Sequence, residues 1–198
     1  MSYQDEGYAY ETPLAGSETE HLIASLERQR AIFAWKCGNL DAAGLRATLG
    51  PSSMTLGGLL KHLAAVEDTH FARLLLAEPP APPWDTVDWD ADPDWEWRTA
   101  ADDTPEQLYD LWAQAVARSR QVVATALANG GLDQLGEFTN SDGRRPSLRR
   151  ILFDLVEEYA RHIGHADLLR ESVDGLTGED MAIPRETEEA GQGLGRHD

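Results

Sequence analysis

The chain has 198 residues, of which 41% are hydrophobic and 26% are charged, as is usual for a globular protein with a substantial core. Acidic residues outnumber basic ones by 35 to 17, and the formal net charge of -18 argues against nucleic acid or an anionic membrane as a partner. No apolar run approaches the roughly 20 residues that a transmembrane helix needs. The single cysteine, Cys37, excludes an internal disulfide and, with the polar N-terminus, predicts a cytoplasmic protein.

The first part of the chain predicts an arm and one long helix. Residues 1–16 mix glycine, proline, tyrosine and acidic residues without periodicity, so we expect a flexible arm there. Ser17 followed by Glu20 is typical of a capping box, and apolar residues at helical spacing follow it. Gly38-Asn39 is a stop signal and sets the predicted end of this helix.

A second long helix is predicted after a short element over residues 41–50. Ser53 or Thr55 can cap this helix, and its apolar pattern continues as far as Pro79. Residues 79–103 are rich in proline, aspartate and tryptophan and show no helix or strand period, so we expect a long loop. Its aromatic rings either wall a pocket for an apolar ligand or hold the loop against the end of a helix bundle. The tryptophans of this loop are Trp84, Trp89, Trp95 and Trp97.

The second half of the chain predicts two further long helices. Thr104 followed by Pro105 is a helix start, and the helix runs to about Ala128, where an Asn-Gly-Gly sequence stops it. A linker with room for short extended structure follows. Ser147 then caps the last helix, which ends near Gly175.

The predicted organisation is one helical domain with a flexible segment at each end. Four long helices within residues 17–175, without a convincing strand run, predict an all-α protein that forms a four-helix bundle. We expect the acidic, glycine-rich residues 176–198 to form a flexible tail. Many bundles of this kind associate through apolar helix faces, so a homodimer is an expected assembly.

The last predicted helix carries three polar side chains on one face. At about 100° per residue, Glu158, His162 and His165 point the same way. His62 lies in an apolar stretch of the second long helix. Two histidines and a carboxylate facing the core of a bundle suit zinc, nickel or iron(II). Spacing alone leaves a metal site, an acid–base pair and a polar seam between helices open, and Asp154 is close enough to this face to be a ligand.

Three segments resemble the DinB-like superfamily, namely LERQRAIFAWKCGNLD, LGGLLKHLAAVEDTHF and LVEEYARHIGHADLLRESVDG. The similarity covers about residues 20–178 and is strongest to the branch that contains mycothiol-dependent maleylpyruvate isomerases and many actinobacterial proteins. This resemblance implies a four-helix bundle with a divalent metal, usually zinc or nickel. It implies one histidine ligand on the second long helix, here His62, and a ligand pair on the last helix, here Glu158 and His162. His165 stands where relatives often have glutamine, so it is either a fourth ligand or a support for one.

The resemblance also implies a reaction on a small electrophilic molecule, a transfer or an isomerisation that uses a thiol such as mycothiol. A metal ion promotes deprotonation of a bound thiol, and His165 or His70 could then carry protons. Arg161 either orients a substrate carboxylate or pairs with a neighbouring acidic residue. Cys37 is either a nucleophile or, as is usual for a lone cysteine, buried. Non-catalytic binding of a metal or small ligand and metal-dependent hydrolysis are the alternative functions.

Overall fold

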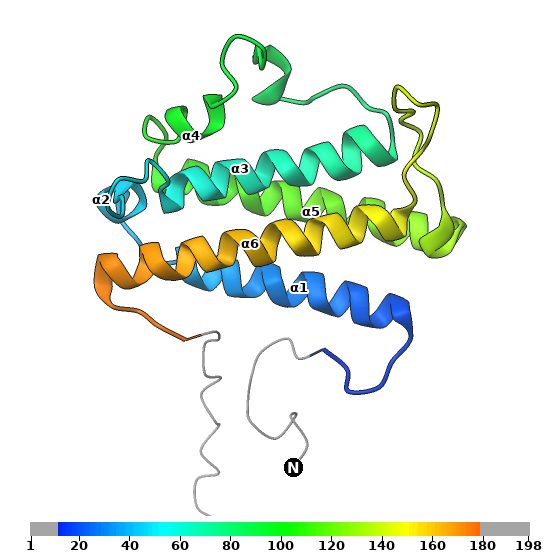
Figure 1. Cartoon of the computed structure of the whole chain (residues 1–198), viewed down its shortest axis with the longest axis horizontal. Coiled ribbons are helices and arrows are strands. Elements are labelled where there is room, and N and C mark those ends of the chain that lie inside the picture. Colours follow the sequence, from blue (N-terminus) through cyan, green and yellow to red (C-terminus); the bar gives the residue numbers. More distant parts are fainter. Residues whose placement is uncertain (1–11, 179–198) are drawn as a thin grey trace, which may run out of the picture.

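The structure, a computed structural model, describes residues 12–178, and four long helices form a bundle in it (Figure 1). These helices are α1 (Glu18–Cys37), α3 (Leu56–Asp68), α5 (Pro105–Asn129) and α6 (Leu148–Asp174). Two short helices, α2 (Ala42–Arg46) and α4 (Trp95–Thr99), lie at one end of the bundle. The described residues contain no β-strand, which confirms the predicted all-α fold.

Parts of the predicted arm and tail, residues 1–11 and 179–198, lie outside the described residues, so their flexibility stays a prediction. The homodimer also stays a prediction, because the structure contains one chain. No helix in residues 12–178 is both long and apolar enough to cross a membrane.

The helices begin where their capping residues predict. The Ser17 side chain accepts a hydrogen bond from the Glu20 backbone N–H, and the Glu20 carboxylate accepts one from the Ser17 backbone N–H at 2.7 Å. Thr104 and Gln107 form the same reciprocal capping box at the start of α5. At the start of α3, Thr55 is the N-cap and accepts from a backbone N–H one turn later. Local side-chain chemistry therefore sets these helix starts.

The long helices pack as two parallel pairs, α1 with α6 and α3 with α5 (Figure 1). Arg149 in the first turn of α6 bonds to Glu18 at the start of α1. Arg170 near the end of α6 donates to the backbone carbonyl of Gly38, just after α1, at 2.6 Å. Because α3 and α5 run in the same direction, the chain must return along the bundle between them. Residues 76–104, which we call the crossover, make this return over α3 (Figure 1).

The crossover contains more regular structure than the loop predicted for it. It includes a 3₁₀ turn at Trp84–Thr86 as well as α4. The buried Trp84 ring donates its Nε1–H to Asp68 at 2.8 Å and lies 5.9 Å from the Trp95 ring, measured between centroids. The Lys61 ammonium lies 4.4 Å from the Trp95 ring centroid. These contacts hold the crossover against α3.

Helix α3 does not continue in the α form as far as its pattern predicts. Residues Thr69–Leu75 form a π-helix in its place. The linker after α5 binds to this segment, and the Glu137 backbone N–H donates to the Leu75 carbonyl at 2.8 Å. A Cβ atom on Gly136 would lie 2.3 Å from the Leu74 carbonyl oxygen, so this approach requires glycine.

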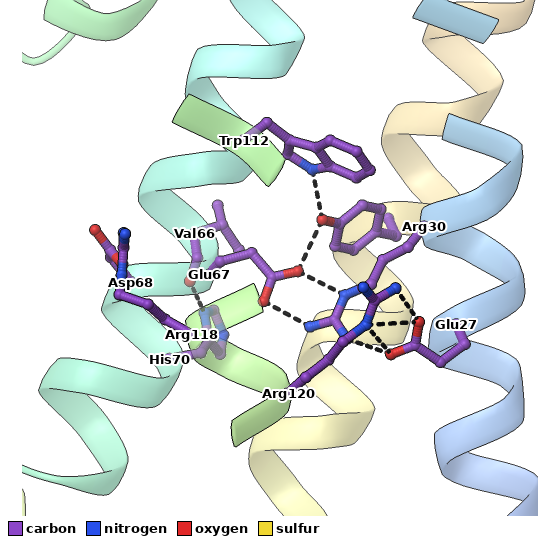
Figure 2. Close-up of polar contacts among 10 residues, drawn as sticks. Glu27, Arg30, Val66, Glu67, Asp68, His70, Trp112, Arg118 and Arg120 are labelled. Atoms are coloured by element: carbon purple, nitrogen blue, oxygen red, sulfur yellow. Dashed lines mark hydrogen bonds and ion pairs between the residues drawn. The ribbon is translucent and has the colours of Figure 1, made fainter. Parts of the chain in front are cut away.

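A buried hydrogen-bond network joins the four long helices (Figure 2). Glu67 of α3 accepts two bonds from Arg30 of α1, at 2.8 and 2.6 Å. Glu67 also accepts a bond from the Tyr159 hydroxyl of α6 at 2.8 Å, and the Trp112 indole of α5 donates to that hydroxyl at 2.8 Å. Because Arg30, Glu67 and Tyr159 are all buried and bond to one another, the network favours this alignment of the helices.

Candidate metal centre

Three of the predicted ligands come together between α3 and α6. His62, Glu158 and His162 each offer one ligand atom, and these atoms all lie within 4.8 Å of one another. The Nε2 atom of His162 is 3.3 Å from Glu158 Oε2, and the His162 residue is only 7% exposed. Two imidazoles and a carboxylate at this separation could hold a divalent ion and leave coordination positions open for other molecules. We call these three residues the ligand cluster.

Each histidine of the ligand cluster already has a partner for its Nδ1 atom. His62 Nδ1 is 3.1 Å from Glu96 Oε1, and His162 Nδ1 is 3.3 Å from His165 Nδ1. The Nε2 atom of each ring therefore remains for a metal ion. Metal-binding histidines usually donate their other N–H to an acceptor, which fixes both the tautomer and the ring orientation. The donor set and these outer contacts together fit a divalent metal.

The surroundings keep His162 in the neutral form that a metal ligand requires. Burial has the largest effect on the pKa of its imidazole, and the charges of the two neighbouring histidines and of Arg161 add to it. Together they lower the pKa of His162 to about 4. Arg161 itself is exposed. Its effect on His162 is electrostatic, and its predicted contact with a substrate stays a prediction.

Helix α4 supplies two contacts to His62 that sequence reasoning missed. The Trp97 ring stacks on the His62 ring, with centroids 4.6 Å apart and planes inclined by 24°. A Cβ atom on Gly58 would lie 2.9 Å from the Trp97 ring, so glycine is needed for the ring to lie against α3. Glu96 is 6% exposed, and its Oε2 atom has no hydrogen-bond partner in residues 12–178. Glu96 lies in an acidic segment without periodicity, so no sequence signal distinguishes it.

Other predicted site residues lie outside the ligand cluster. His165 contacts His162 and adds no ligand atom to the described cluster. The Nδ1 atom of His70 is 2.8 Å from the Val66 carbonyl oxygen, one turn back along its own helix (Figure 2). Asp154 accepts a hydrogen bond from Arg150 at 2.7 Å. The structure therefore brings His165 beside the cluster, while it gives His70 and Asp154 other partners.

Cys37 has the buried position that is usual for a lone cysteine. Its side chain lies in the core at the end of α1, and the residue is 1% exposed. Burial raises the pKa of its thiol well above the usual range. A thiol that is neither ionised nor accessible is a poor nucleophile, which disfavours a catalytic role for Cys37.

A cavity of about 260 Å³ lies beside the ligand cluster, between α3 with its π-helical extension and the crossover. His62 and Glu96 form part of its lining, so the cavity adjoins the candidate metal centre. Most of the remaining wall is apolar and includes the Trp84 and Trp89 rings. The crossover tryptophans therefore serve both alternatives that the sequence left open: they hold the crossover in place and they wall a pocket.

The ligand cluster and nearly the whole bundle fall within one match to a protein family. A family model described as Mycothiol-S-transferase matches residues 21–175. A search of curated proteins finds no match to the chain. The family match covers most of the sequence, and the all-helical bundle agrees with the DinB-like fold that the motifs imply. The chain belongs to the mycothiol-S-transferase family.

Proposed function

We propose that the protein is a metal-dependent S-transferase that joins a low-molecular-weight thiol of the mycothiol type to a small electrophile. The observation that carries this proposal is the cluster of His62, Glu158 and His162 in a chain of the mycothiol-S-transferase family. Zinc and nickel suit a donor set of two imidazoles and one carboxylate. The cavity beside His62 offers a small molecule a route to this centre.

The residues around the cluster have positioning roles in this proposal. A divalent cation held by the cluster supplies positive charge that lowers the pKa of a thiol bound beside it. Glu96 accepts the Nδ1–H bond of His62 and holds that ring. The Nδ1 atoms of His165 and His162 lie 3.3 Å apart, so in this proposal His165 takes the corresponding place beside His162. We therefore propose that His165 orients the ligand His162 and does not transfer protons. We assign no catalytic step to His70.

The proposed reaction forms a C–S bond between the thiol sulfur and an electrophilic carbon. With monochlorobimane as electrophile, chloride leaves with the electron pair of the broken C–Cl bond, and the thiol proton passes to solvent. The chain itself is not covalently modified. Because the thiol of Cys37 is buried, the sulfur nucleophile has to come from a separate small molecule.

Metal content tests the first part of the proposal. Protein purified without chelators should carry about one zinc or nickel ion per chain, as three protein ligands predict for a single site. His62→Ala should lose this metal, while His70→Ala, which changes a histidine outside the cluster, should retain it. Retention of the full metal content by His62→Ala would refute the metal centre.

Thiol dependence tests the second part. We expect conjugation of monochlorobimane in the presence of mycothiol, with loss of activity on metal removal and recovery on metal addition. In cobalt-substituted protein, added thiol should produce a sulfur-to-cobalt charge-transfer band. A metal-loaded protein that shows neither thiol-dependent turnover nor this band would be a metal-binding protein without transferase activity. Thiol-dependent rearrangement of a substrate without a C–S product would indicate an isomerase.

A further inference from the structure

We infer that the cavity beside the ligand cluster binds an uncharged, planar electrophile with a largely apolar body and discriminates against carboxylates. The inference rests on the proposed function for the reaction that the bound molecule undergoes. Binding to the cavity can be measured without that reaction. Three features of the cavity carry the inference: its size, its aromatic wall and its balance of charge.

The size of the cavity suits a molecule of one or two rings. Its volume is about 260 Å³, whereas an engineered cavity of about 150 Å³ in another protein is large enough for benzene. His62 belongs both to the ligand cluster and to the cavity lining. A molecule that fills the cavity therefore has one end beside the candidate metal centre.

One ring of the aromatic wall of the cavity, Trp84, is held in place by its own contacts. Trp84 is 4% exposed, and its indole N–H is bonded to Asp68 at 2.8 Å. Trp95 supports this ring and also the Trp89 ring, whose centroid lies 6.3 Å from that of Trp95. Trp89 is 38% exposed, so one ring of the wall remains in contact with solvent. Flat aromatic faces, one of them held by a hydrogen bond, favour a planar apolar ligand at low entropic cost.

The end of the cavity near the ligand cluster has no net positive charge, even with a divalent cation bound. The formal charges of Glu158 and Glu96 together balance those of a divalent cation held by the cluster. A bound thiolate would then make this end of the cavity negative. The chain as a whole has a formal net charge of -18, which adds repulsion of the same sign. An electrophile with a carboxylate would therefore meet repulsion where it has to react.

Charged groups elsewhere in the lining are also balanced. Asp68 is paired with Arg118 at 2.8 Å. Arg73 and Glu78 are both exposed and carry opposite charges, and the Arg73 guanidinium lies 5.4 Å from the Phe138 ring centroid. The lining carries three acidic residues, Asp68, Glu78 and Glu96, and its Arg73 is exposed, so solvent screens the attraction that Arg73 offers to an anion. A carboxylate in the cavity would therefore lose hydration without an equivalent gain, which costs binding free energy. An uncharged ligand avoids that cost.

A matched pair of probes tests the inference. 1,3-Dinitrobenzene is planar and uncharged, and 3,5-dinitrobenzoate adds one carboxylate to the same ring. Neither has a leaving group for thiol transfer, so their dissociation constants can be measured by calorimetric titration of zinc-loaded and metal-free protein. In metal-free protein, where a carboxylate cannot coordinate an open metal position, we expect 1,3-dinitrobenzene to bind at least about tenfold more tightly than 3,5-dinitrobenzoate.

Filling the cavity should abolish this binding. Ala72→Phe and Thr69→Trp place a large ring in the lining, and each should weaken 1,3-dinitrobenzene binding by about tenfold or more. Ala117→Phe makes a similar change at an exposed position of α5 and should leave binding unchanged. Thr69 is exposed, so Thr69→Trp keeps the test informative if Ala72→Phe fails to fold. Glu78→Lys should raise the affinity for 3,5-dinitrobenzoate by about two- to fivefold, as expected for an exposed charge.

The outcomes separate this inference from the proposed function. Equal or tighter binding of 3,5-dinitrobenzoate by metal-free protein would overturn it, as would unchanged 1,3-dinitrobenzene binding in both filled variants. The native protein could bind 1,3-dinitrobenzene selectively, lose this binding in the filled variants and show no thiol-dependent turnover. That result would support the cavity assignment and refute the transferase. Thiol-dependent turnover that survives filling of the cavity would support the transferase and refute the cavity assignment.

Discussion

Glu96→Gln should weaken metal binding without removing a ligand. In the native protein His62 Nδ1 lies 3.1 Å from Oε1 of Glu96, a residue that is almost fully buried. Glutamine keeps the size of the side chain and an acceptor oxygen, but it loses the negative charge. Hydrogen bonds to charged groups contribute about 1.5–3 kcal/mol and neutral ones about 0.5–1.5 kcal/mol, so the difference is about 1–1.5 kcal/mol. That difference corresponds to a zinc dissociation constant raised about five- to twelvefold.

Competition between the protein and a chromophoric zinc chelator measures this effect on the dissociation constant. Glu157→Gln is the matched control, because it removes the same charge from an exposed position next to the ligand Glu158. Nitrogen NMR of the metal-free protein gives a separate readout, in which His62 should be protonated on Nδ1 in the native chain. A zinc dissociation constant for Glu96→Gln within twofold of the native value would refute the positioning role. An equal loss of zinc affinity in Glu157→Gln would show that the effect comes from the general loss of negative charge.

Three further predictions concern the core and the contact between α3 and α4. Tyr159→Phe should lower the free energy of unfolding by about 2–4 kcal/mol in urea titrations, because the buried Glu67 and the half-buried Trp112 each lose a hydrogen bond. Tyr109 is half-buried, so Tyr109→Phe should lower the free energy of unfolding by less. Equal losses of unfolding free energy in the two variants would contradict the role of the network. Cys37 should react with a thiol reagent only after unfolding, and rapid labelling of native protein would show that it is accessible. Gly58→Ala should displace Trp97 and weaken zinc binding severalfold, and unchanged affinity would show that the ring stacking does not support the site.

Features that depend on neighbours in the sequence were predictable. Ser17 and Thr104 start their helices through bonds to residues three positions later, so the sequence alone indicates them. Glu158 and His162 share a helix face because of the helical period. The partnership of His62 with that pair came from the family resemblance, since periodicity cannot show which helices pack together.

Features that depend on contacts between distant segments were not predictable. Glu96 comes within hydrogen-bond distance of His62 only because the crossover returns over α3. The π-helix at Thr69–Leu75 lies where the linker after α5 binds, about 60 residues further along the chain. The role of His165 depended on the direction of its ring, which spacing leaves open. For Glu96 and for the π-helix, the deciding partner is remote in sequence and follows no period.

The parallel pairing of α3 and α5 has a consequence for protein engineering. The three candidate ligands lie on α3 and α6, whereas much of the cavity wall comes from the crossover. A transplanted crossover could therefore give the candidate metal centre a different range of electrophilic substrates. Glu96 and Trp97 would have to be kept for their contacts with His62. The architecture thus separates the helices that hold the candidate ligands from the segment that forms much of the cavity wall. A small library confined to the segment between Pro79 and Trp89 is thus the natural starting point for redirecting selectivity.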